Sequence, residues 1–259
     1  MILVVTRHNR HRFDVLLNDM VHLRNDSAAG PGRTAFAGMD AFDQADPTYL
    51  LCLDSDYRLA GCARLLETTG PHVLPLLTRG DPDALPDLFG PDTREVSALC
   101  VDHRRLSPGH GQDTVFQTLC ELMAGLLIHA RRHGAKRILT VLDPAMDRAL
   151  RRAGNVPDQD LPLPAGDLTP PMVAARTDCN SDRVAEILDR AAITGPLFAT
   201  DAEVQNAIRP LTHGALDPDL QDYCLQQITN ARSGRERAAA LALRRALTGM
   251  SRSHRKCDA

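Results

Sequence analysis

Carboxylates stand at two points of the chain where they could meet a positively charged substrate. Asp40, Asp43 and Asp46 lie close together directly before an apolar run, and Glu95 leads into another apolar run. A carboxylate can bind an ammonium or sulfonium group, and one that reaches an amine can take its proton. The pattern therefore predicts either a site for a cationic ligand or a set of ion pairs inside the fold.

Two arginines are candidate partners for these acids. Arg12 begins a stretch in which apolar residues recur at helical spacing, and Arg64 stands inside an apolar run typical of a strand. A buried charge without a partner is very costly, so Arg64 requires a carboxylate nearby. The residue types alone leave two interpretations open: a structural network that ties strands to a helix, or a ligand site.

The elements that would position these residues alternate between strand and helix. The apolar patterns predict strands at residues 1–6, 49–53, 59–66, 96–101, 137–142 and 172–176. They predict helices at residues 12–23, 113–133, 144–152 and 181–191, with 25–39 as a loop. After Gly195-Pro196 the pattern becomes helical. We therefore expect an α/β domain over residues 1–196 and a helical extension over 197–259.

Composition excludes several classes of protein. The chain has 259 residues, 43% of them hydrophobic and 24% charged, which is typical of a globular protein with one sizeable core. A formal charge of −3 gives no indication of nucleic-acid binding. Seven scattered cysteines indicate reduced thiols. The sequence shows neither a signal peptide nor an apolar run of about 18 residues, so we expect a cytoplasmic protein without a membrane span.

Three segments occur in an informative order. The first runs from Asp40-Ala-Phe-Asp43 to Asp46-Pro-Thr-Tyr-Leu-Leu, the second is Gly61-Cys-Ala-Arg-Leu-Leu-Glu-Thr-Thr-Gly-Pro, and the third is Arg94-Glu-Val-Ser-Ala-Leu-Cys-Val. Together they resemble the autoinducer synthase (acyl-homoserine-lactone synthase) family, whose members carry D-x-Y-D, G-x-x-R-L-L-x-T-T-G-P and W-E-L-S-R-F segments in this order. The resemblance is strongest over residues 36–102 and extends over about 10–196.

The resemblance implies a fold and an activity. Such proteins have a fold like the GNAT acyltransferases, with a twisted mixed sheet, splayed to admit an acyl thioester, and helices on both faces. They transfer an acyl group from acyl-carrier protein or acyl-CoA to the amine of S-adenosylmethionine. They then close a lactone, release methylthioadenosine and so produce a quorum-sensing signal. S-adenosylmethionine is a substrate, and we expect no cofactor and no metal; a homodimer is compatible with the resemblance.

The resemblance also implies roles for individual residues. Asp40 and Asp43 would bind the positive groups of S-adenosylmethionine, and Arg12 or Arg64 its carboxylate. Glu95, directly or through a water molecule, would be the general base that deprotonates the amine. Backbone N–H groups at the splayed sheet would stabilise the oxyanion.

The chain departs from the family pattern at several positions. Leu16 and His22 replace a Phe and a Trp, and Ala98 replaces the Arg of the third segment; Gly38 and Arg94 replace an acid and a Trp. These changes leave two alternatives open. One is a GNAT-type N-acyltransferase with a different amine substrate, and the other is a catalytically degenerate relative that binds an acyl carrier or a partner through residues 197–259.

Two further sets of residues are candidates for the acyl donor. Ser97 and Thr140 match positions of the acyl pocket, although Thr is also favoured in any strand. Basic residues exceed acids in residues 101–155, where they could attract an acidic carrier protein or the phosphates of coenzyme A, or simply form a solvated helix face. The candidates for this docking surface are Arg104, Arg105, Arg131, Arg132, Lys136, Arg151 and Arg152.

Overall fold

The computed structural model describes most of the chain. The described residues are 1–29, 38–78, 88–102, 111–161, 163 and 172–213, followed by 223, 224, 226–228, 233, 236 and 239–244. The chain divides into two compact units, Met1–Asp201 and Ala202–Ala259. The first unit holds the sheet and every element that bears on the candidate site.

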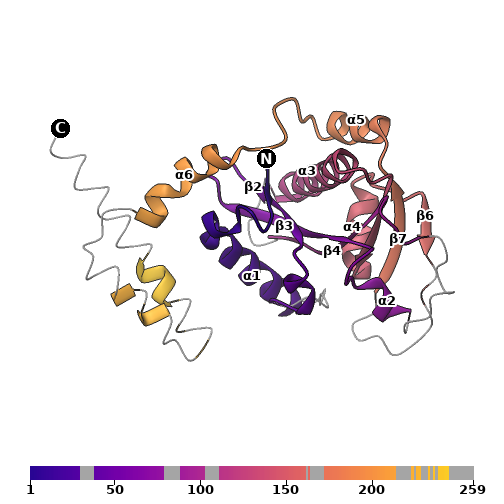
Figure 1. Ribbon diagram of the computed structural model, residues 1–259. Helices are drawn as coiled ribbons and strands as arrows, with labels where there is room; N and C mark the ends of the chain where they lie inside the picture. The colour runs from indigo at the N-terminus through magenta and orange to yellow at the C-terminus, as the bar shows by residue number, and fades with distance from the viewer. Residues whose placement is uncertain are drawn as a thin grey trace. The chain divides into compact units, whose positions relative to one another are not determined.

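A seven-stranded mixed sheet forms the centre of the first unit (Figure 1). Its strands lie in the order β1-β2-β3-β4-β5-β7-β6, and only β4 and β5 are parallel to each other among the described pairs. The bounds are β1 Ile2–Val5, β2 Thr48–Leu53, β3 Leu59–Glu67, β4 Thr93–Val101, β5 Arg137–Leu142, β6 Gln159–Leu161 and β7 Val173–Asp178. The central strands are almost wholly buried, which explains their nearly continuous apolar sequences.

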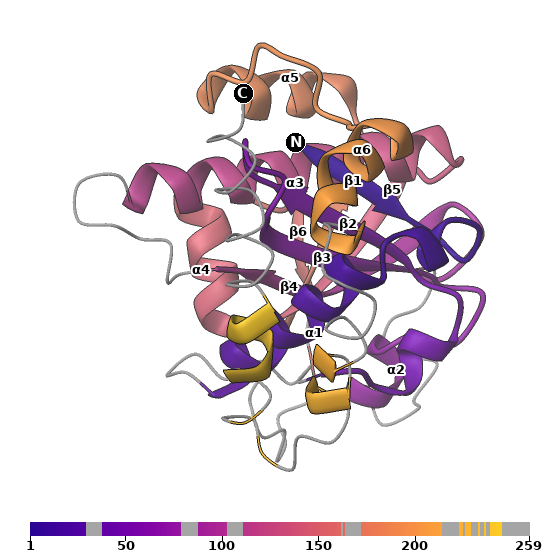
Figure 2. The same ribbon diagram turned by 90° about the vertical axis from the view of Figure 1, so that its left-hand side faces the viewer.

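Helices cover both faces of this sheet (Figures 1 and 2). The helices of the first unit are α1 Asp14–Ala29, α2 Leu74–Leu77, α3 Gly111–Arg132, α4 Pro144–Arg152 and α5 Ser181–Arg190, with 3-10 turns η1 Arg10–Arg12 and η2 Ala41–Gln44. Alternate side chains of a strand point to opposite faces. Ala63, Leu65 and Val96 pack with α3, α4 and α5 in one apolar core, and we call this side the α3 face.

The opposite side, which we call the α1 face, is different in character. It carries Cys62 and Arg64 of β3 and Glu95 and Ser97 of β4, and α1 packs against these two strands. A second apolar cluster lies on the same side further along the sheet, built from α2, β5 and β7. The α1 face therefore combines buried charges with a neighbouring apolar cluster.

The sheet opens between β4 and β5. These strands pair over Thr93–Val96 and Arg137–Thr140, and the remainder of β4 has no partner on β5 among the described pairs. At the point where pairing ends, Ala98 has a positive φ of 51° and the register with β3 shifts, which marks a β-bulge. A bulge bends its strand away from its neighbour. The α/β fold with a splayed mixed sheet is thus confirmed.

Several elements differ from the sequence prediction. Helix α1 begins at Asp14, after the turn η1, and continues to Ala29 into a segment predicted as loop. The short α2 and β6 were not predicted because each is too brief to show a period. Helix α5 ends at Arg190, one residue earlier than predicted, and Asn180 caps its start by accepting a hydrogen bond from the Arg183 N–H.

The end of the first unit lies beyond the expected boundary. The Ile2 N–H donates to the Leu197 carbonyl at 2.6 Å, and the Ala199 N–H donates to the Ile2 carbonyl at 2.9 Å. Residues 197–199 therefore belong to the first unit by their pairing with β1. Beyond them, helix α6 spans Asp201–His213 and includes Pro210. Among the described residues, none of the helices has the length and apolar character needed to cross a bilayer.

Candidate active site

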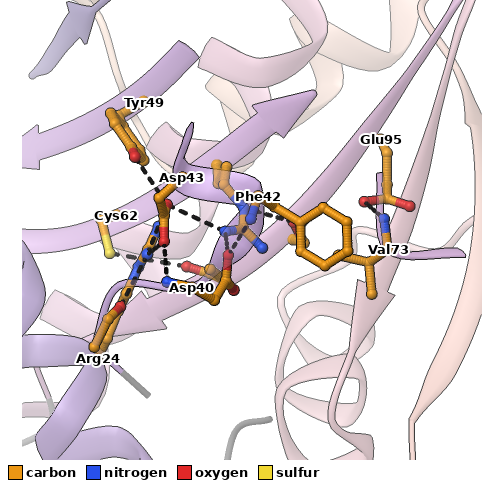
Figure 3. A network of polar contacts seen from close by, with 12 residues as sticks. Arg24, Asp40, Phe42, Asp43, Tyr49, Cys62, Val73 and Glu95 are labelled. Atoms are coloured by element: carbon orange, nitrogen blue, oxygen red, sulfur yellow. Dashed lines mark hydrogen bonds and ion pairs between the residues drawn. The ribbon is translucent and has the colours of Figure 1, made fainter. Parts of the chain in front are cut away.

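Asp43 is the centre of a buried polar network on the α1 face (Figure 3). Its two oxygens lie 3.0 and 2.9 Å from Nη1 of Arg24 on α1. The Tyr49 hydroxyl donates to Oδ1 at 2.8 Å, and the Asp40 N–H donates to Oδ2 at 2.8 Å. Asp43 thus ties α1, the turn η2 and β2 together.

Arg64 extends this network to Asp40 and to β4. Its Nη1 lies 2.5 Å from Oδ1 of Asp40 and 3.1 Å from Oδ1 of Asp43, while its Nε donates to Oγ of Ser97 at 3.1 Å. The Arg64 side chain is fully buried, whereas that of Asp40 is 27% exposed. Asp40 also caps η2 by accepting from the Phe42 N–H. Of the paired acids, Asp40 is the one that reaches solvent.

The electrostatics favour the ionised forms of this network. Burial raises the pKa of Asp43, but the charges of Arg24 and Arg64 and the Asp40 N–H outweigh it and hold that pKa below its usual value. Burial and the nearby Asp43 carboxylate raise the pKa of the Tyr49 phenol. Two arginines and two aspartates leave the network formally neutral. It can therefore remain buried and still present one carboxylate edge to a ligand.

Glu95 lies at the other end of the site and is fully buried. Its Oε1 accepts from the Val73 N–H at 2.9 Å and its Oε2 from the Leu74 N–H at 2.6 Å, so it anchors the start of α2. Burial raises the pKa of Glu95, although the two backbone N–H groups, His72 and Arg64 act in the opposite direction. Both carboxylate oxygens are already engaged in holding the chain.

Phe42 links the two ends of the site. Its ring lies 5.5 Å from Cζ of Arg64, and Figure 3 shows it between Asp40 and the Val73–Glu95 contact. Phe42 also packs against the second apolar cluster, which includes Leu74 of α2 and Leu139 of β5. The arrangement offers a charged end, an aromatic wall and an apolar region beside the splayed strands. Such a site suits a substrate pair with one cationic and one apolar member.

The arginine that α1 contributes is Arg24, which the sequence analysis missed. Arg12 instead lies in η1 with a half-exposed side chain, and its ion pair is with Asp201 at 3.5 Å. The structure therefore brings Asp40, Asp43 and Arg64 together without Arg12. A signal for Arg24 was present: it follows Met20 by one helical turn, on the stripe that the apolar residues of α1 mark for burial.

The two residues proposed for the acyl pocket lie on opposite faces of the sheet. Ser97 belongs to the α1 face, where its hydroxyl accepts from Arg64. Thr140 has the same parity on β5 as Ile138 and Leu142, which belong to the core of the α3 face. Its hydroxyl donates to the Ala175 carbonyl of β7 at 3.3 Å. Their role in acyl binding stays a prediction.

The basic residues proposed for carrier docking lie in different parts of the fold. Arg131, Arg132 and Lys136 are exposed near the turn between α3 and β5, where Lys136 pairs with Asp92 at 3.4 Å. On α4, Arg151 pairs with Asp147 and Asp160. The remaining member of α4 is the exposed Arg152. Arg104 and Arg105 lie outside the described residues, and docking at this surface stays a prediction.

Metal binding finds no support in the part of the chain that the structure describes. No group of three or more His, Cys, Asp or Glu side chains there is arranged to hold a metal ion. The buried acids are engaged by arginines, a phenol and backbone N–H groups instead.

Curated proteins with similar sequences share one description. The chain is 33% identical over 120 residues to a probable acyl-homoserine-lactone synthase of Sinorhizobium fredii, covering 44% of the chain and 55% of that protein. It is 33% identical over 121 residues to an acyl-homoserine-lactone synthase of Acinetobacter nosocomialis, covering 45% and 64%. The chain thus spans between about half and just under two thirds of the length of these relatives.

Solved structures show the same fold. A CoA-dependent acyl-homoserine lactone synthase, BjaI, matches with a TM-score of 0.58 and 23% identity, over 80% of this chain and 98% of that one. A second CoA-dependent synthase, MesI, matches with a TM-score of 0.54 and 24% identity, over 77% and 99%. At this identity the likeness concerns the fold.

The sequence profile of the family supplies the remaining evidence. It is described as autoinducer synthase and matches residues 32–187. This range includes Asp40, Asp43, Arg64 and Glu95, together with the bulge of β4. On the length of this match and the agreement in fold, the chain belongs to the autoinducer synthase family.

Proposed function

We propose that the chain is an acyl-homoserine-lactone synthase that acylates the amine of S-adenosylmethionine and closes the product to a lactone. The observation that carries this proposal is the neutral Arg24–Asp43–Arg64–Asp40 network, which ends in one partly exposed carboxylate next to the splayed strands. The names of the similar curated proteins support it. A structure of BjaI is described with S-adenosylmethionine and isopentyl-CoA, which supports the same substrate classes here.

The charges of the substrate fit the charged end of the site. S-adenosylmethionine carries a sulfonium, an ammonium and a carboxylate group. The free edge of Asp40 would bind a positive group, and Asp43 would act mainly by fixing Asp40 and Arg64 in place. Because the network balances its own charge, it adds no net repulsion toward a substrate that carries both signs.

The acyl donor would enter where the sheet opens. Backbone N–H groups near the Ala98 bulge would stabilise the oxyanion as the amine attacks the thioester, the C–N bond forms and the thiol leaves. The amine must first lose a proton, and the group that accepts it would lie at the end of the site that holds Glu95. The substrate carboxylate then attacks the γ-carbon, closes the ring and expels methylthioadenosine. An acyl-carrier protein and acyl-CoA are both candidate donors.

The test is an assay of the purified chain with S-adenosylmethionine and an octanoyl thioester of coenzyme A or of acyl-carrier protein. We expect equal amounts of acyl-homoserine lactone and methylthioadenosine by mass spectrometry. Asp40→Asn keeps an oxygen to cap η2 but loses the charge, and should raise KM for S-adenosylmethionine at least about tenfold.

Asp46→Asn is the matched control. Asp46 is 59% exposed and pairs with Arg7 at the surface, so its loss should leave KM unchanged. Thiol release with another amine but not with S-adenosylmethionine would favour the alternative N-acyltransferase. An absence of thiol release with every amine tested would favour a catalytically degenerate relative.

A further inference from the structure

His72 is a buried imidazole beside the site that the proposed function has not used. It follows Gly70-Pro71 after β3 and is only 7% exposed. Its Nδ1 lies 2.8 Å from the Gly70 carbonyl oxygen. A carbonyl can only accept a hydrogen bond, so Nδ1 carries the hydrogen. In the neutral ring, Nε2 is therefore the unprotonated nitrogen with a free lone pair.

That nitrogen is without a partner in the described part of the chain. Nε2 of His72 is buried and makes no hydrogen bond there. The ring is held on one side by Phe89, with the ring centroids 4.9 Å apart in an edge-to-face arrangement. Buried polar atoms are almost always hydrogen-bonded, so an orphaned one requires an explanation. An imidazole nitrogen with an unused lone pair, in a ring whose other nitrogen is already hydrogen-bonded, is a candidate proton acceptor.

Glu95 is the charged group that accompanies His72. The neighbouring Val73 N–H donates to Glu95, and Figure 3 shows this contact at the end of the site away from Tyr49. His72 and Glu95 interact electrostatically, as do Arg64 and Glu95. Both oxygens of Glu95 already accept backbone N–H groups, which makes the carboxylate a poorer acceptor for a substrate proton. Its negative charge can still stabilise a protonated imidazole nearby.

We propose that Nε2 of His72 receives the proton of the amine nucleophile, while Glu95 stabilises the resulting imidazolium and positions the turn that carries it. This inference rests on the proposed function and assigns its proton acceptor. The substrate ammonium gives one proton to Nε2 and becomes a neutral amine. The amine forms the C–N bond as the C–S bond breaks, and its second proton goes to the leaving thiolate. His72 then returns its proton to water after the product leaves.

The test compares His72→Asn with the wild type in single-turnover acylation. The Asn side chain can still donate to the Gly70 carbonyl in the place of Nδ1, but it has no basic nitrogen. We expect its rate near pH 7 to fall by about 100-fold or more. The deficit should shrink by up to tenfold per pH unit toward about pH 9, because solution hydroxide can then deprotonate the amine. Binding of S-adenosylmethionine, measured by calorimetry, should be unchanged.

His8→Asn is the matched control, because His8 is exposed and distant in sequence from the site; its rate should equal that of the wild type. A deficit of His72→Asn that stays constant across pH would show a structural role and overturn the proposal, as would a rate within a few-fold of the wild type. If the Asn variant fails to fold, His72→Gln replaces it, and a constant deficit or a near-wild-type rate in that variant would overturn the proposal in the same way. A wild-type chain that forms no lactone at any pH would instead refute the proposed function itself, and the assignment of His72 with it.

Discussion

The two faces of the sheet carry opposite kinds of interior. The α3 face is filled by aliphatic side chains and small residues that pack without charge. The α1 face, built on the same strands, buries Arg24, Arg64, Asp43 and Glu95 completely. Charge inside a protein is costly even when paired, whereas aliphatic packing is favourable by itself. The α3 face therefore stabilises the fold, and this stabilisation offsets the cost of the fixed set of charges buried on the α1 face.

This contrast explains how adjacent residues of one strand can have different roles. Arg64 and Leu65 follow each other on β3, but one enters the ion network and the other the apolar core. The same holds for Glu95 and Val96 on β4. We therefore expect substitutions on the α1 face to change both stability and ligand binding, and those on the α3 face to change stability alone.

The largest effect is expected for Arg24→Met. The substitution removes the guanidinium that contacts both oxygens of Asp43 and leaves that carboxylate buried with less compensation. The free energy of unfolding, from urea titration, should fall by about 3–5 kcal/mol. Calorimetry should show weaker binding of S-adenosylmethionine, because η2 and Asp40 lose their anchor.

The double variant Arg24→Met/Asp43→Asn distinguishes the loss of stability from the loss of ligand binding. Removing both charges should cost less stability than the sum of the single losses, because no buried acid is left uncompensated. Ligand binding should stay weak in the double variant. If instead binding recovered together with stability, the network would have only a structural role, and the difference between the two faces in ligand binding would be contradicted.

Leu122→Ala is the corresponding substitution on the α3 face. Leu122 is fully buried on α3, and its truncation should lower the free energy of unfolding by about 2–4 kcal/mol through lost burial and a residual cavity. The affinity for S-adenosylmethionine should be unchanged at a temperature where the variant is folded. A loss of affinity comparable to that of Arg24→Met would show that the two faces are coupled.

Much of the α3 face could be predicted from the sequence, whereas the α1 face could be predicted only in part. Strands β2, β3 and β5 and helix α4 follow from long apolar patterns that local residues determine. The pairing of Arg24 with Asp43 joins residues 19 positions apart across an element boundary, and periodicity cannot show such a contact. The resemblance located Asp40, Asp43 and Arg64, but it assigned the helix arginine to Arg12, which the structure places elsewhere.

The chemistry at the Glu95 end was also beyond the sequence. Glu95 stood out because it precedes an apolar strand, yet nothing in the pattern indicated that both of its oxygens accept N–H groups of residues 73 and 74. The short α2 carries no period, so neither that contact nor the burial of His72 could be foreseen. The bulge at Ala98 likewise depends on strand register, which is a property of the assembled sheet.

A smaller loss is expected at Gly61 of β3, where a side chain would meet α3. A Cβ at Gly61 would lie 2.8 Å from Cγ2 of Thr118 and 3.0 Å from the Cys100 carbonyl oxygen. Gly61→Ala should therefore lower the free energy of unfolding by about 1–3 kcal/mol through overpacking. Adding Thr118→Ser removes the nearest methyl group and should restore part of this loss, but not the part due to the carbonyl. Full recovery, or none, in the urea titration would contradict the geometry.

The smallest effect is a pH dependence at the rim of the α3 face. Burial, followed by the positive charges of His133 and Arg132, lowers the pKa of His129 from 6.5 to about 4. Because the folded-state pKa lies below the unfolded one, the unfolded state binds the proton more readily. The contribution of His129 to stability is therefore complete above about pH 6.5 and is lost as the pH falls toward 4.

His129→Gln should show a smaller drop in urea midpoint between about pH 7 and about pH 5 than the wild type. His8→Gln, at an exposed position, should show the wild-type drop. Asp43, whose pKa is lowered, titrates in a more acidic range and is common to all three proteins, so it does not affect the comparison. Equal drops in the wild type and His129→Gln would show that His129 is protonated in the folded state as easily as in the unfolded chain.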